Sequence, residues 1–436
     1  MTPEPADEVV ARYDDSGEVV GKVARSVMRR GNLWHAASSV VVRDPFGCIY
    51  LHRRTTTKDV YPGLLDFAAG GVVLAGEAPA LGAVREVDEE LGVHGVPLEP
   101  LGAVAYADSH TRYHAHRFTA WWDGPIRWQP EEVSWGDWVV VDELLHRVEQ
   151  EPEAFVPDSV AVWGGVLRSW RADRVLLEQG WDSEATLVEG RWVDRTPRRP
   201  DVEPQLLSEA DLLPLIGDTL RQTGIEVPRP RVVRRQPLTV RHPIVVGRPA
   251  DPERLAADDG DRLGRFLSLL HGTADSVVAA AGLASAANDL VETVNQLERL
   301  RHEVVPLLDA PAREVAATLL ATVSVPSDRV LCHADLVPEH VLVREGRVAG
   351  IIDWGDARLT DPAIDLAWPL HGTNRAFAGA VRTAYAASDD VVQRARAWWA
   401  LAPWFDVHRD VLLADDAALA DDLDTLTGRL RWWHSD

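Results

Sequence analysis

The sequence predicts an α/β domain followed by an α+β domain, and three observations support this fold class. The chain has 436 residues, of which 46% are hydrophobic, so it is long enough for two or three separate cores. Within residues 1–171, short strand-like runs flank one glycine-bounded helix. Near residues 171–178 the pattern restarts, and strand-like segments again precede a series of amphipathic helices.

Turn residues and runs of apolar residues define the elements of the first domain, which we place at residues 1–171. Asp44-Pro-Phe-Gly47 is typical of a tight turn between two strands. The expected strands are 38–42, 48–51, 117–122 and 138–141, and the expected helices are 78–91, 142–149 and 158–170. Strands flanked by helices predict an α/β/α sandwich.

Three glutamates on the predicted helix at 78–91 are candidates for a catalytic, metal-binding role. Glu86, Glu89 and Glu90 stand at i, i+3 and i+4, so they share one face of the helix. Crowded carboxylates repel one another unless a hard divalent cation lies among them, and Mg²⁺ (or Mn²⁺) takes oxygen ligands together with substrate phosphate oxygens. This face therefore predicts catalytic, metal-binding glutamates that clamp a diphosphate. The alternative interpretation is an ordinary solvated acidic face.

The segment from Gly71 to Val93 matches the pattern G-x5-E-x7-R-E-U-x-E-E-x-G-U, where U is aliphatic, at every position. Seven literal residues of ordinary abundance coincide by chance with a probability of about 10^-8 per starting position. Residues 1–171 thus resemble the Nudix hydrolases. The resemblance implies Mg²⁺-dependent hydrolysis of a nucleoside-diphosphate-type or other diphosphate compound.

Residues 53–71 resemble the Nudix branch that includes isopentenyl-diphosphate isomerase-like proteins. No cysteine stands in the strand that leads into the box, and Cys48 lies in an earlier strand, so the intact box favours hydrolysis over isomerisation. By the same resemblance, Glu132 is a candidate further carboxylate from a later loop, either a metal ligand or a base. An exposed loop acid is the alternative interpretation of Glu132.

The composition limits the partners of the protein. The formal net charge of −23 argues against nucleic acid and anionic membranes. No apolar run approaches the roughly 20 residues that span a membrane, and the acidic N-terminus does not resemble a signal sequence, so we expect a cytoplasmic protein. Arginine far outnumbers lysine, which occurs only at Lys22 and Lys58. The sequence carries no signal for an oligomeric state.

A second group of candidate residues lies between positions 333 and 365. The loop His333-Ala-Asp335 continues to His340, and an apolar run ends in Ile-Ile-Asp353-Trp-Gly355. An Asp on a tight loop can accept the proton of a substrate hydroxyl, while a second Asp after a strand can hold Mg²⁺ against nucleotide phosphates. We therefore predict Asp335 as the catalytic base and Asp353 as a metal ligand.

These motifs resemble the kinase catalytic loop H-x-D-x4-N and its D-x-G motif, and more closely those of the aminoglycoside and macrolide phosphotransferases. The resemblance implies a bilobal protein-kinase-like fold over residues 172–436, with a small lobe at about 172–247 and a helical large lobe at about 248–436. It also implies ATP or GTP as the phosphate donor and a hydroxylated small molecule as the acceptor. The residues that match its nucleotide-binding positions are Asp182, Ser183, Arg195 and Glu209.

Three positions depart from the family pattern. Arg195 stands where lysine is usual, although a guanidinium also holds phosphate and carboxylate together. An alanine follows His333 where glycine is common. His340 occupies the metal-binding asparagine position, and we expect its neutral imidazole to bind or orient a metal.

The sequence as a whole predicts a bifunctional enzyme that joins a diphosphatase to a small-molecule kinase. In the related phosphotransferases, helices near the C-terminus line the acceptor pocket, and acids there suit a polyamine-like sugar. Four aspartates are candidates, with solubilising surface charge as their alternative role: Asp406, Asp410, Asp415 and Asp416. Two functional alternatives also stay open, because one half can act only as a binding module and the kinase half can act on a metabolite.

Overall fold

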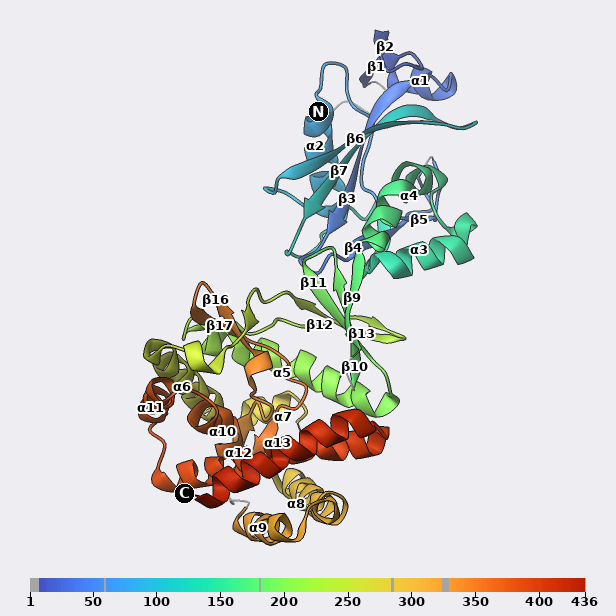
Figure 1. The fold of residues 1–436 in the computed structure, drawn as a ribbon. Coiled ribbons are helices and arrows are strands. Elements are labelled where there is room, and N and C mark those ends of the chain that lie inside the picture. The colour runs from blue at the N-terminus through green and yellow to red at the C-terminus, as the bar shows by residue number, and fades with distance from the viewer. Residues whose placement is uncertain (1–7, 59, 180–181, 284–285, 324–328, 436) are drawn as a thin grey trace. The chain divides into compact units, whose positions relative to one another are not determined.

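The computed structural model describes residues 8–435 except 59, 180–181, 284–285 and 324–328 (Figure 1). The chain divides into two compact units. The first comprises residues 1–179, 184–194 and 233–241, and the second comprises residues 180–183, 195–232 and 242–436. The division after residue 171 that the sequence suggested stays a prediction.

A six-stranded mixed sheet forms the centre of the first unit. Its strands follow the order β5-β4-β3-β7-β6, with β8 paired to β4. The central pair, β3 and β7, is parallel, whereas β4 pairs with β3, β5 and β8 in antiparallel fashion. The strands of this unit are β1 (Val9–Tyr13), β2 (Val19–Ala24), β3 (His35–Arg43), β4 (Ile49–Arg54), β5 (Leu65–Asp66), β6 (Leu98–Ala107), β7 (Arg112–Trp121) and β8 (Val133–Val139).

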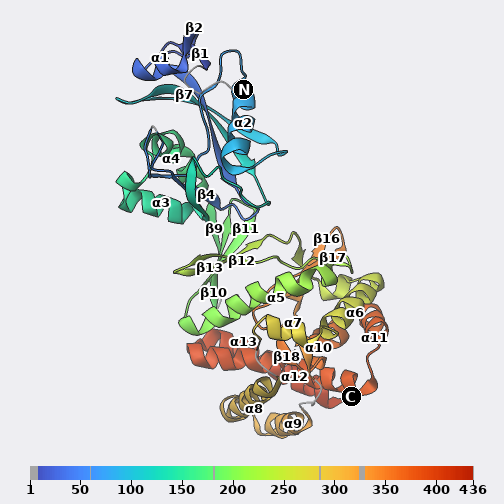
Figure 2. The ribbon, with the colours of Figure 1, turned by 180° about the vertical axis from the view of Figure 1, so that it is seen from behind.

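Helices cover both faces of this sheet, as Figures 1 and 2 show. Val40 and Val42 of β3 share a buried cluster with the apolar face of helix α2 (Pro79–Leu91). Val41, which points to the opposite face, joins the cluster formed with α3 (Val141–Gln150) and α4 (Pro157–Ala172). The predicted α/β/α sandwich is therefore confirmed. A short helix, α1 (Arg25–Arg30), follows the β1–β2 hairpin.

The remaining strands form smaller sheets. A five-stranded sheet has the order β12-β13-β11-β10-β9, and β14-β16-β17 and β15-β18 form two further sheets. Their bounds are β9 (Arg174–Gln179), β10 (Ser183–Val188), β11 (Trp192–Pro197), β12 (Arg231–Arg235), β13 (Leu238–Pro243), β14 (Arg248–Pro249), β15 (Val330–Cys332), β16 (Val341–Arg344), β17 (Arg347–Ile351) and β18 (Arg358–Thr360).

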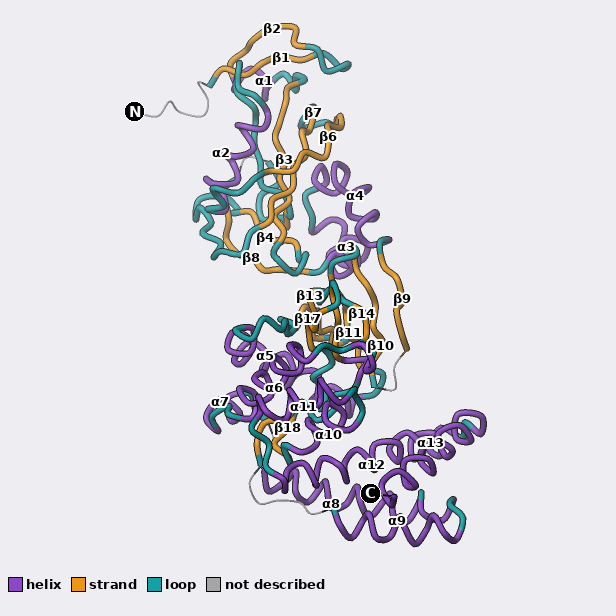
Figure 3. Tube along the Cα trace, turned by 60° about the vertical axis from the view of Figure 1, so that its left-hand side comes forward, coloured by secondary structure: helices purple, strands orange, loops and turns teal. Residues whose placement is uncertain are grey.

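Helices dominate the second unit, in agreement with the predicted helical large lobe (Figure 3). They are α5 (Glu203–Arg221), α6 (Ala257–His271), α7 (Asp275–Ala280), α8 (Ala286–Glu303), α9 (Ala310–Thr322), α10 (Ala363–His371), α11 (Arg375–Tyr385), α12 (Asp389–Leu413) and α13 (Asp416–Ser435). No helix within the described ranges is both long and apolar enough to cross a membrane.

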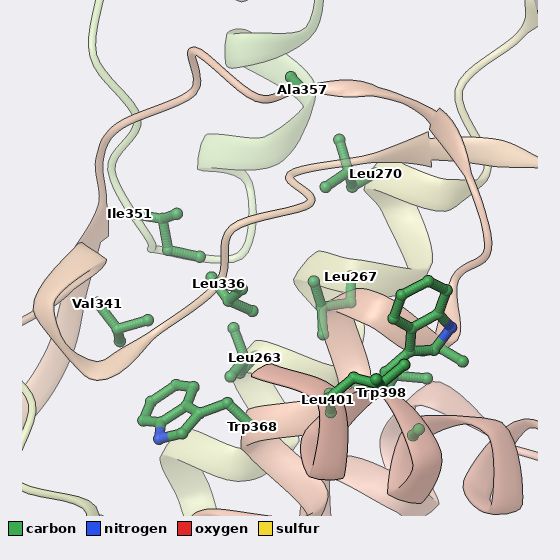
Figure 4. Packing of buried hydrophobic residues seen from close by; sticks show 14 of the residues in the cluster. Leu263, Leu267, Leu270, Leu336, Val341, Ile351, Ala357, Trp368, Trp398 and Leu401 are labelled. Carbon is green, nitrogen blue, oxygen red and sulfur yellow. The ribbon is translucent and has the colours of Figure 1, made fainter. Parts of the chain in front are cut away.

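One continuous apolar core holds the loop that carries the predicted base Asp335 in place (Figure 4). Leu263 and Leu267 of α6 lie beside Leu336, which immediately follows Asp335. Trp398 and Leu401 of α12 belong to the same cluster. Close packing of this kind resists displacement, so the loop is attached to a rigid support.

Several element boundaries differ from those expected. The strand predicted at 138–141 is β8, which begins earlier at Val133. The sequence also predicts separate helices at 393–404 and 410–420, and this prediction is wrong, because α12 continues from Asp389 to Leu413 and α13 starts at Asp416 after a left-handed residue at Ala414. Strands β1, β2 and β6 were not expected.

Two buried histidines make the stability of the first unit depend on pH. His35 and His52 are each 2% exposed, and burial lowers the pKa of both to about 4. A folded-state pKa below the ordinary value of about 6.5 means that stability is complete above pH 6.5 and is lost as the pH falls toward 4. Each histidine should therefore cost about 2 kcal/mol of stability between pH 7 and pH 5.

Urea unfolding of the full chain at pH 7 and pH 5 measures this effect. We expect His52→Gln to reduce the difference between the two unfolding free energies by about 2 kcal/mol. His94→Gln is the matched control because the side chain of His94 is 68% exposed. An unchanged pH difference in His52→Gln would show that the imidazole is protonated without cost in the folded state.

Candidate functional site

The predicted metal-binding helix is α2, whose ends are defined by its sequence. Pro79 occupies the first turn, where its missing N–H is tolerated, and Gly92 ends the helix in the left-handed region with a φ of 69°. Within α2, the side chain of Glu89 is 57% exposed, whereas those of Glu86 and Glu90 are 14% and 7% exposed. Two of the three predicted ligands are therefore already withdrawn from water.

The loop before α2 contacts both buried carboxylates. The Gly70 backbone N–H donates to Glu90 Oε2 at 3.1 Å. A Cβ atom at Gly71 would lie 2.3 Å from Glu86 Oε1, so only glycine permits this approach. Burial raises the pKa of Glu86 against the opposing effect of Arg85, and burial together with Glu132 raises the pKa of Glu90. Both carboxylates are thus poorly solvated anions that a cation would stabilise.

Arg85 explains why an arginine and a further glutamate belong to the sequence pattern. Its guanidinium donates to Glu86 Oε1 at 2.7 Å, to Glu77 Oε1 at 3.3 Å and to Glu89 Oε2 at 3.3 Å. Glu77 in turn accepts a hydrogen bond from the Leu74 N–H at 2.9 Å. This network connects the loop to the helix and orients the ligand carboxylates.

Glu132 lies beside the helix glutamates. Lys58 Nζ is 2.5 Å from Glu132 Oε2 and 3.8 Å from Glu90 Oε1, so its ammonium group lies between the two carboxylates. A cation therefore fits between Glu90 and Glu132, and carboxylate oxygens of this kind suit Mg²⁺ or Mn²⁺. Lys58 belongs to the segment 53–71 discussed above, but the sequence does not show that its ammonium group lies between two carboxylates. That contact depends on the fold.

The second predicted site is built around the loop after β15. His333 is fully buried, its Nε2 is 3.0 Å from the carbonyl oxygen of Ile352, and its Nδ1 accepts from the Asp335 N–H at 3.3 Å. The buried Asp365 accepts from the N–H groups of His333 at 2.8 Å and Ala334 at 2.7 Å. These bonds fix the loop and leave the side chain of Asp335 43% exposed, available to a substrate.

The loop has unusual backbone conformations where the sequence departs from its relatives. Ala334 has a φ of 66° and Asp353 a φ of 61°, both in the left-handed region that glycine adopts without strain. The glycine that is common after the loop histidine in related proteins suits this conformation, and alanine adopts it at a modest cost.

His340 lies between the predicted base and the predicted metal ligand. Its Nδ1 is 2.8 Å from the Asp335 carbonyl oxygen and 3.3 Å from Asp335 Oδ2, and its Nε2 is 3.7 Å from Asp353 Oδ2. If Nδ1–H donates to the carbonyl, the lone pair of Nε2 faces Asp353. Nε2 and Asp353 are therefore placed to share a cation.

The predicted nucleotide-binding residues surround Arg195 on β11. Arg195 Nη1 is 2.7 Å from Asp353 Oδ1 and 3.5 Å from Glu209 Oε2, and its Nε donates to Ser183 Oγ at 3.1 Å. Burial raises the pKa of Glu209 to about 7, although Arg195 opposes this effect. Burial alone would raise the pKa of Asp353, but Arg195 lowers it. The structure thus brings the matched basic and acidic residues together.

Asp182, the other predicted nucleotide-binding residue, is not bonded to Arg195. Its carboxylate accepts from Arg199 Nη2 at 2.8 Å instead. Asp182 immediately precedes Ser183, so it lies at the start of β10 beside the Arg195 cluster.

Two of the four C-terminal aspartates form a cluster with Arg409. The guanidinium lies 2.7 Å from Asp406, 3.2 Å from Asp410 and 3.4 Å from Asp422. Burial raises the pKa of Asp406, and Asp410 and Asp335 contribute to that rise, so Asp406 lies within electrostatic range of the predicted base. Asp415 caps α13 by accepting from the Ala418 N–H, and Asp416 begins that helix. These contacts give no support for Asp415 or Asp416 as lining residues of an acceptor pocket.

One functional contact was not expected from the sequence. His271, the last residue of α6, is 3.1 Å from Asp365 Oδ2 through Nε2 and 2.8 Å from the Tyr385 hydroxyl through Nδ1. No local pattern marks His271, because its partners are 94 and 114 residues away. Its hydrogen bond to Asp365 orients the carboxylate that holds the loop of the predicted base Asp335.

Each site combines carboxylates with a neighbouring cationic side chain, which is typical of enzymes that handle phosphate groups. A family model described as "Phosphotransferase enzyme family" matches residues 173–404, and one described as "NUDIX domain" matches residues 33–159. The chain therefore belongs to the phosphotransferase enzyme family and, through its N-terminal part, to the Nudix hydrolases. Both are enzyme families, so the protein is an enzyme.

Relatives and solved structures agree with this assignment. The uncharacterized Nudix hydrolase orf19 of Rhodococcus erythropolis is 44% identical over 168 residues, which cover 36% of this chain and 91% of the relative. The uncharacterized Nudix hydrolase YfcD of Escherichia coli strain K12 is 39% identical over 159 residues, which cover 36% of this chain and 86% of the relative. The GDP and kanamycin complex of APH(2″)-IIIa has a TM-score of 0.53 and 21% identity, and the match covers 61% of this chain and 97% of that chain. The likeness confirms the predicted kinase-like fold.

Proposed function

We propose that the protein is a bifunctional enzyme with a diphosphatase site on α2 and a small-molecule kinase site around Asp335. The observation that carries the proposal is the same in both sites. In each, buried or partly buried carboxylates converge on a position where a basic side chain already lies, Lys58 in one case and Arg195 in the other. Such positions suit a divalent cation and the phosphate groups that accompany it.

In the diphosphatase site, Glu86, Glu90 and Glu132 would hold Mg²⁺ or Mn²⁺. Bound there, the cation would neutralise charge on the diphosphate. Arg85 orients the carboxylates, and the Gly70 N–H fixes Glu90. Glu89 is the most exposed of the helix glutamates, which suits contact with water or with a second cation.

In the kinase site, Asp335 would accept the proton of the acceptor hydroxyl while Asp353 and His340 would hold Mg²⁺ with ATP or GTP. The bound cation would neutralise charge on the nucleotide phosphates. Arg195 would bind a phosphate, with Glu209 and Ser183 holding the guanidinium in place. Backbone bonds to His333 and His340 hold Asp335 in place, and its carboxylate, although 3.3 Å from His340 Nδ1, is 43% exposed and accessible to the acceptor.

The acidic cluster at Arg409 favours a polycationic acceptor such as an aminoglycoside over a macrolide, which carries fewer amino groups. Burial, with Asp410 and Asp335 adding to it, raises the pKa of Asp406, and burial with Asp410 raises the pKa of Asp422 to about 6. Anions crowded in this way are stabilised by an ammonium group. The structural neighbour APH(2″)-IIIa binds kanamycin, which agrees with this preference but does not extend it to this chain.

Paired assays of the intact chain test the proposal. Phosphate release from diphosphate compounds and phosphate transfer from ATP or GTP to aminoglycosides, macrolides and sugars should both require Mg²⁺ or Mn²⁺. Activity in only one assay would favour the alternative in which the other half is a ligand-binding module. Transfer to a sugar or other metabolite but to neither antibiotic class would favour a metabolic kinase.

His340 provides a sharper test of the kinase site. We expect His340→Asn to keep most of the phosphotransfer, since asparagine is the usual residue at this position in kinases. His340→Ala should lower the rate and raise the Mg²⁺ concentration needed for half-maximal activity by about tenfold, because one ligand position is lost. Rates measured over a Mg²⁺ titration compare the three proteins, and equal Mg²⁺ dependence would mean that His340 is structural.

A further inference from the structure

An open pocket in the first unit adjoins the diphosphatase residues. Its wall includes Gly70 and Gly71. The same two glycines contact Glu90 and Glu86, respectively. A diphosphate held at these carboxylates would therefore direct its organic group into the pocket.

The far wall of the pocket is polar. Asp66 and Asp158 both line it and are joined by Ser159, whose hydroxyl donates to Asp66 Oδ1 at 2.7 Å and whose N–H donates to Asp158 Oδ1 at 2.9 Å. The Tyr113 hydroxyl donates to Asp158 Oδ2 at 2.9 Å, and Arg54 lies 3.6 Å from Asp66 Oδ2. The two carboxylates are thus held by the fold before any ligand arrives.

The Asp158 carboxylate in this wall is suited to accept hydrogen bonds. Burial, with Asp66 adding to it, raises the pKa of Asp158 to about 6. Above pH 7 the carboxylate of Asp158 is mainly ionised and accepts hydrogen bonds without donating any. The aliphatic side chains of the lining are all small, and the rings of two tyrosines complete its apolar part: Ala37, Val60, Ala68, Val72, Val156, Tyr61 and Tyr113.

An apolar group in this pocket would remove water from the carboxylates and hydroxyls without replacing its hydrogen bonds, which is costly. A group with several hydroxyls would replace those bonds. Resting on the proposed diphosphatase function, we infer that the pocket binds the organic part of the substrate and that this part is polyhydroxylated, as in a sugar diphosphate. A prenyl diphosphate does not fit this chemistry, although the sequence resembles the isopentenyl-diphosphate isomerase-like branch.

Glucose 1-diphosphate and cyclohexyl diphosphate form a matched pair for the test, because they share a six-membered ring and differ mainly in hydroxyl groups. With the full chain and Mg²⁺, we expect kcat/KM for the glucosyl compound to be higher by about 10²-fold or more. Asp158→Ala should reduce this preference at least about tenfold through KM, without lowering the rate for the cyclohexyl compound.

Two further variants support the comparison. Asp158→Asn keeps an acceptor for Tyr113 and should reduce the preference even if the alanine variant folds poorly. Asp173→Ala, at the exposed end of the same helix α4, is the matched control and should leave the preference unchanged. Equal efficiency with both compounds, or an equal loss for both in the Asp158 variants, would overturn the inference.

Calorimetric binding of the two compounds separates the inference from the proposed function. If neither compound is hydrolysed but the glucosyl compound binds at least about tenfold more tightly and Asp158→Ala removes the difference, the diphosphatase proposal fails and the pocket assignment stands. If both bind equally, the pocket assignment fails, whatever the hydrolysis rates.

Discussion

Asp335→Asn should silence phosphotransfer while leaving nucleotide binding intact. The amide cannot accept the proton of the acceptor hydroxyl, and loss of a general base commonly costs about 10²-fold or more in turnover. Nucleotide binding should persist because Arg195 contacts Asp353, Glu209 and Ser183 and makes no contact with Asp335 in the described structure. Steady-state rates and nucleotide-dependent thermal shifts measure the two properties separately.

The backbone of the loop should survive this substitution. His340 Nδ1 lies 2.8 Å from the carbonyl oxygen of Asp335, and the Asp335 N–H donates to His333, so neither bond uses the carboxylate. Asp211→Asn is a suitable control, since Asp211 is an exposed residue of α5 in the same unit. Retention of more than about a tenth of the turnover in Asp335→Asn would exclude Asp335 as the base.

The second large effect is expected for Glu90→Gln, which should reduce diphosphate hydrolysis by about 10² to 10³-fold or more. Glu90 is nearly buried and lies between the Gly70 N–H and the Lys58 ammonium, so glutamine removes a charge where water cannot replace it. Phosphotransfer should be unchanged, because that activity depends on residues of the other unit.

Glu89→Gln and Glu149→Gln complete the series. Glu89 belongs to the same sequence pattern, and its variant should also lose hydrolysis. The exposed Glu149 on α3 serves as a control for the removal of one surface charge. Parental hydrolysis rates in Glu90→Gln would show that the carboxylates of α2 do not form the metal site.

The candidate residues could be predicted where chemistry fixes their spacing along the chain. Glu86 and Glu90 had to share a helix face, and Asp335 and Asp353 had to follow strands, so short patterns located them. Lys58 and His271 could not be found in this way, because their partners lie far away in the sequence. The roles of all these residues stay predictions until the variants are measured.

The fold could be predicted where apolar periodicity was regular. The runs in β3 and α2 are regular, and the layers they form agree with the expectation. β6 contains Pro100 and Gly102, which suggest a loop, and the strand accommodates them with a register shift between Pro100 and Ala103. The sequence also gave no signal for the break between α12 and α13, because the residue that takes the left-handed conformation there is Ala414 and not a glycine.

The ammonium group of Lys58 gives the diphosphatase site an intrinsic chemical reporter. Lys22 and Lys58 are the only lysines in the chain, so amine acylation produces a small set of products that mass spectrometry separates. The ammonium group of Lys58 lies beside the carboxylates of Glu132 and Glu90, which would bind a divalent cation. A cation bound there would displace the ammonium group toward solvent, and the acylation rate of Lys58 relative to Lys22 would follow the occupancy of the site without any substrate.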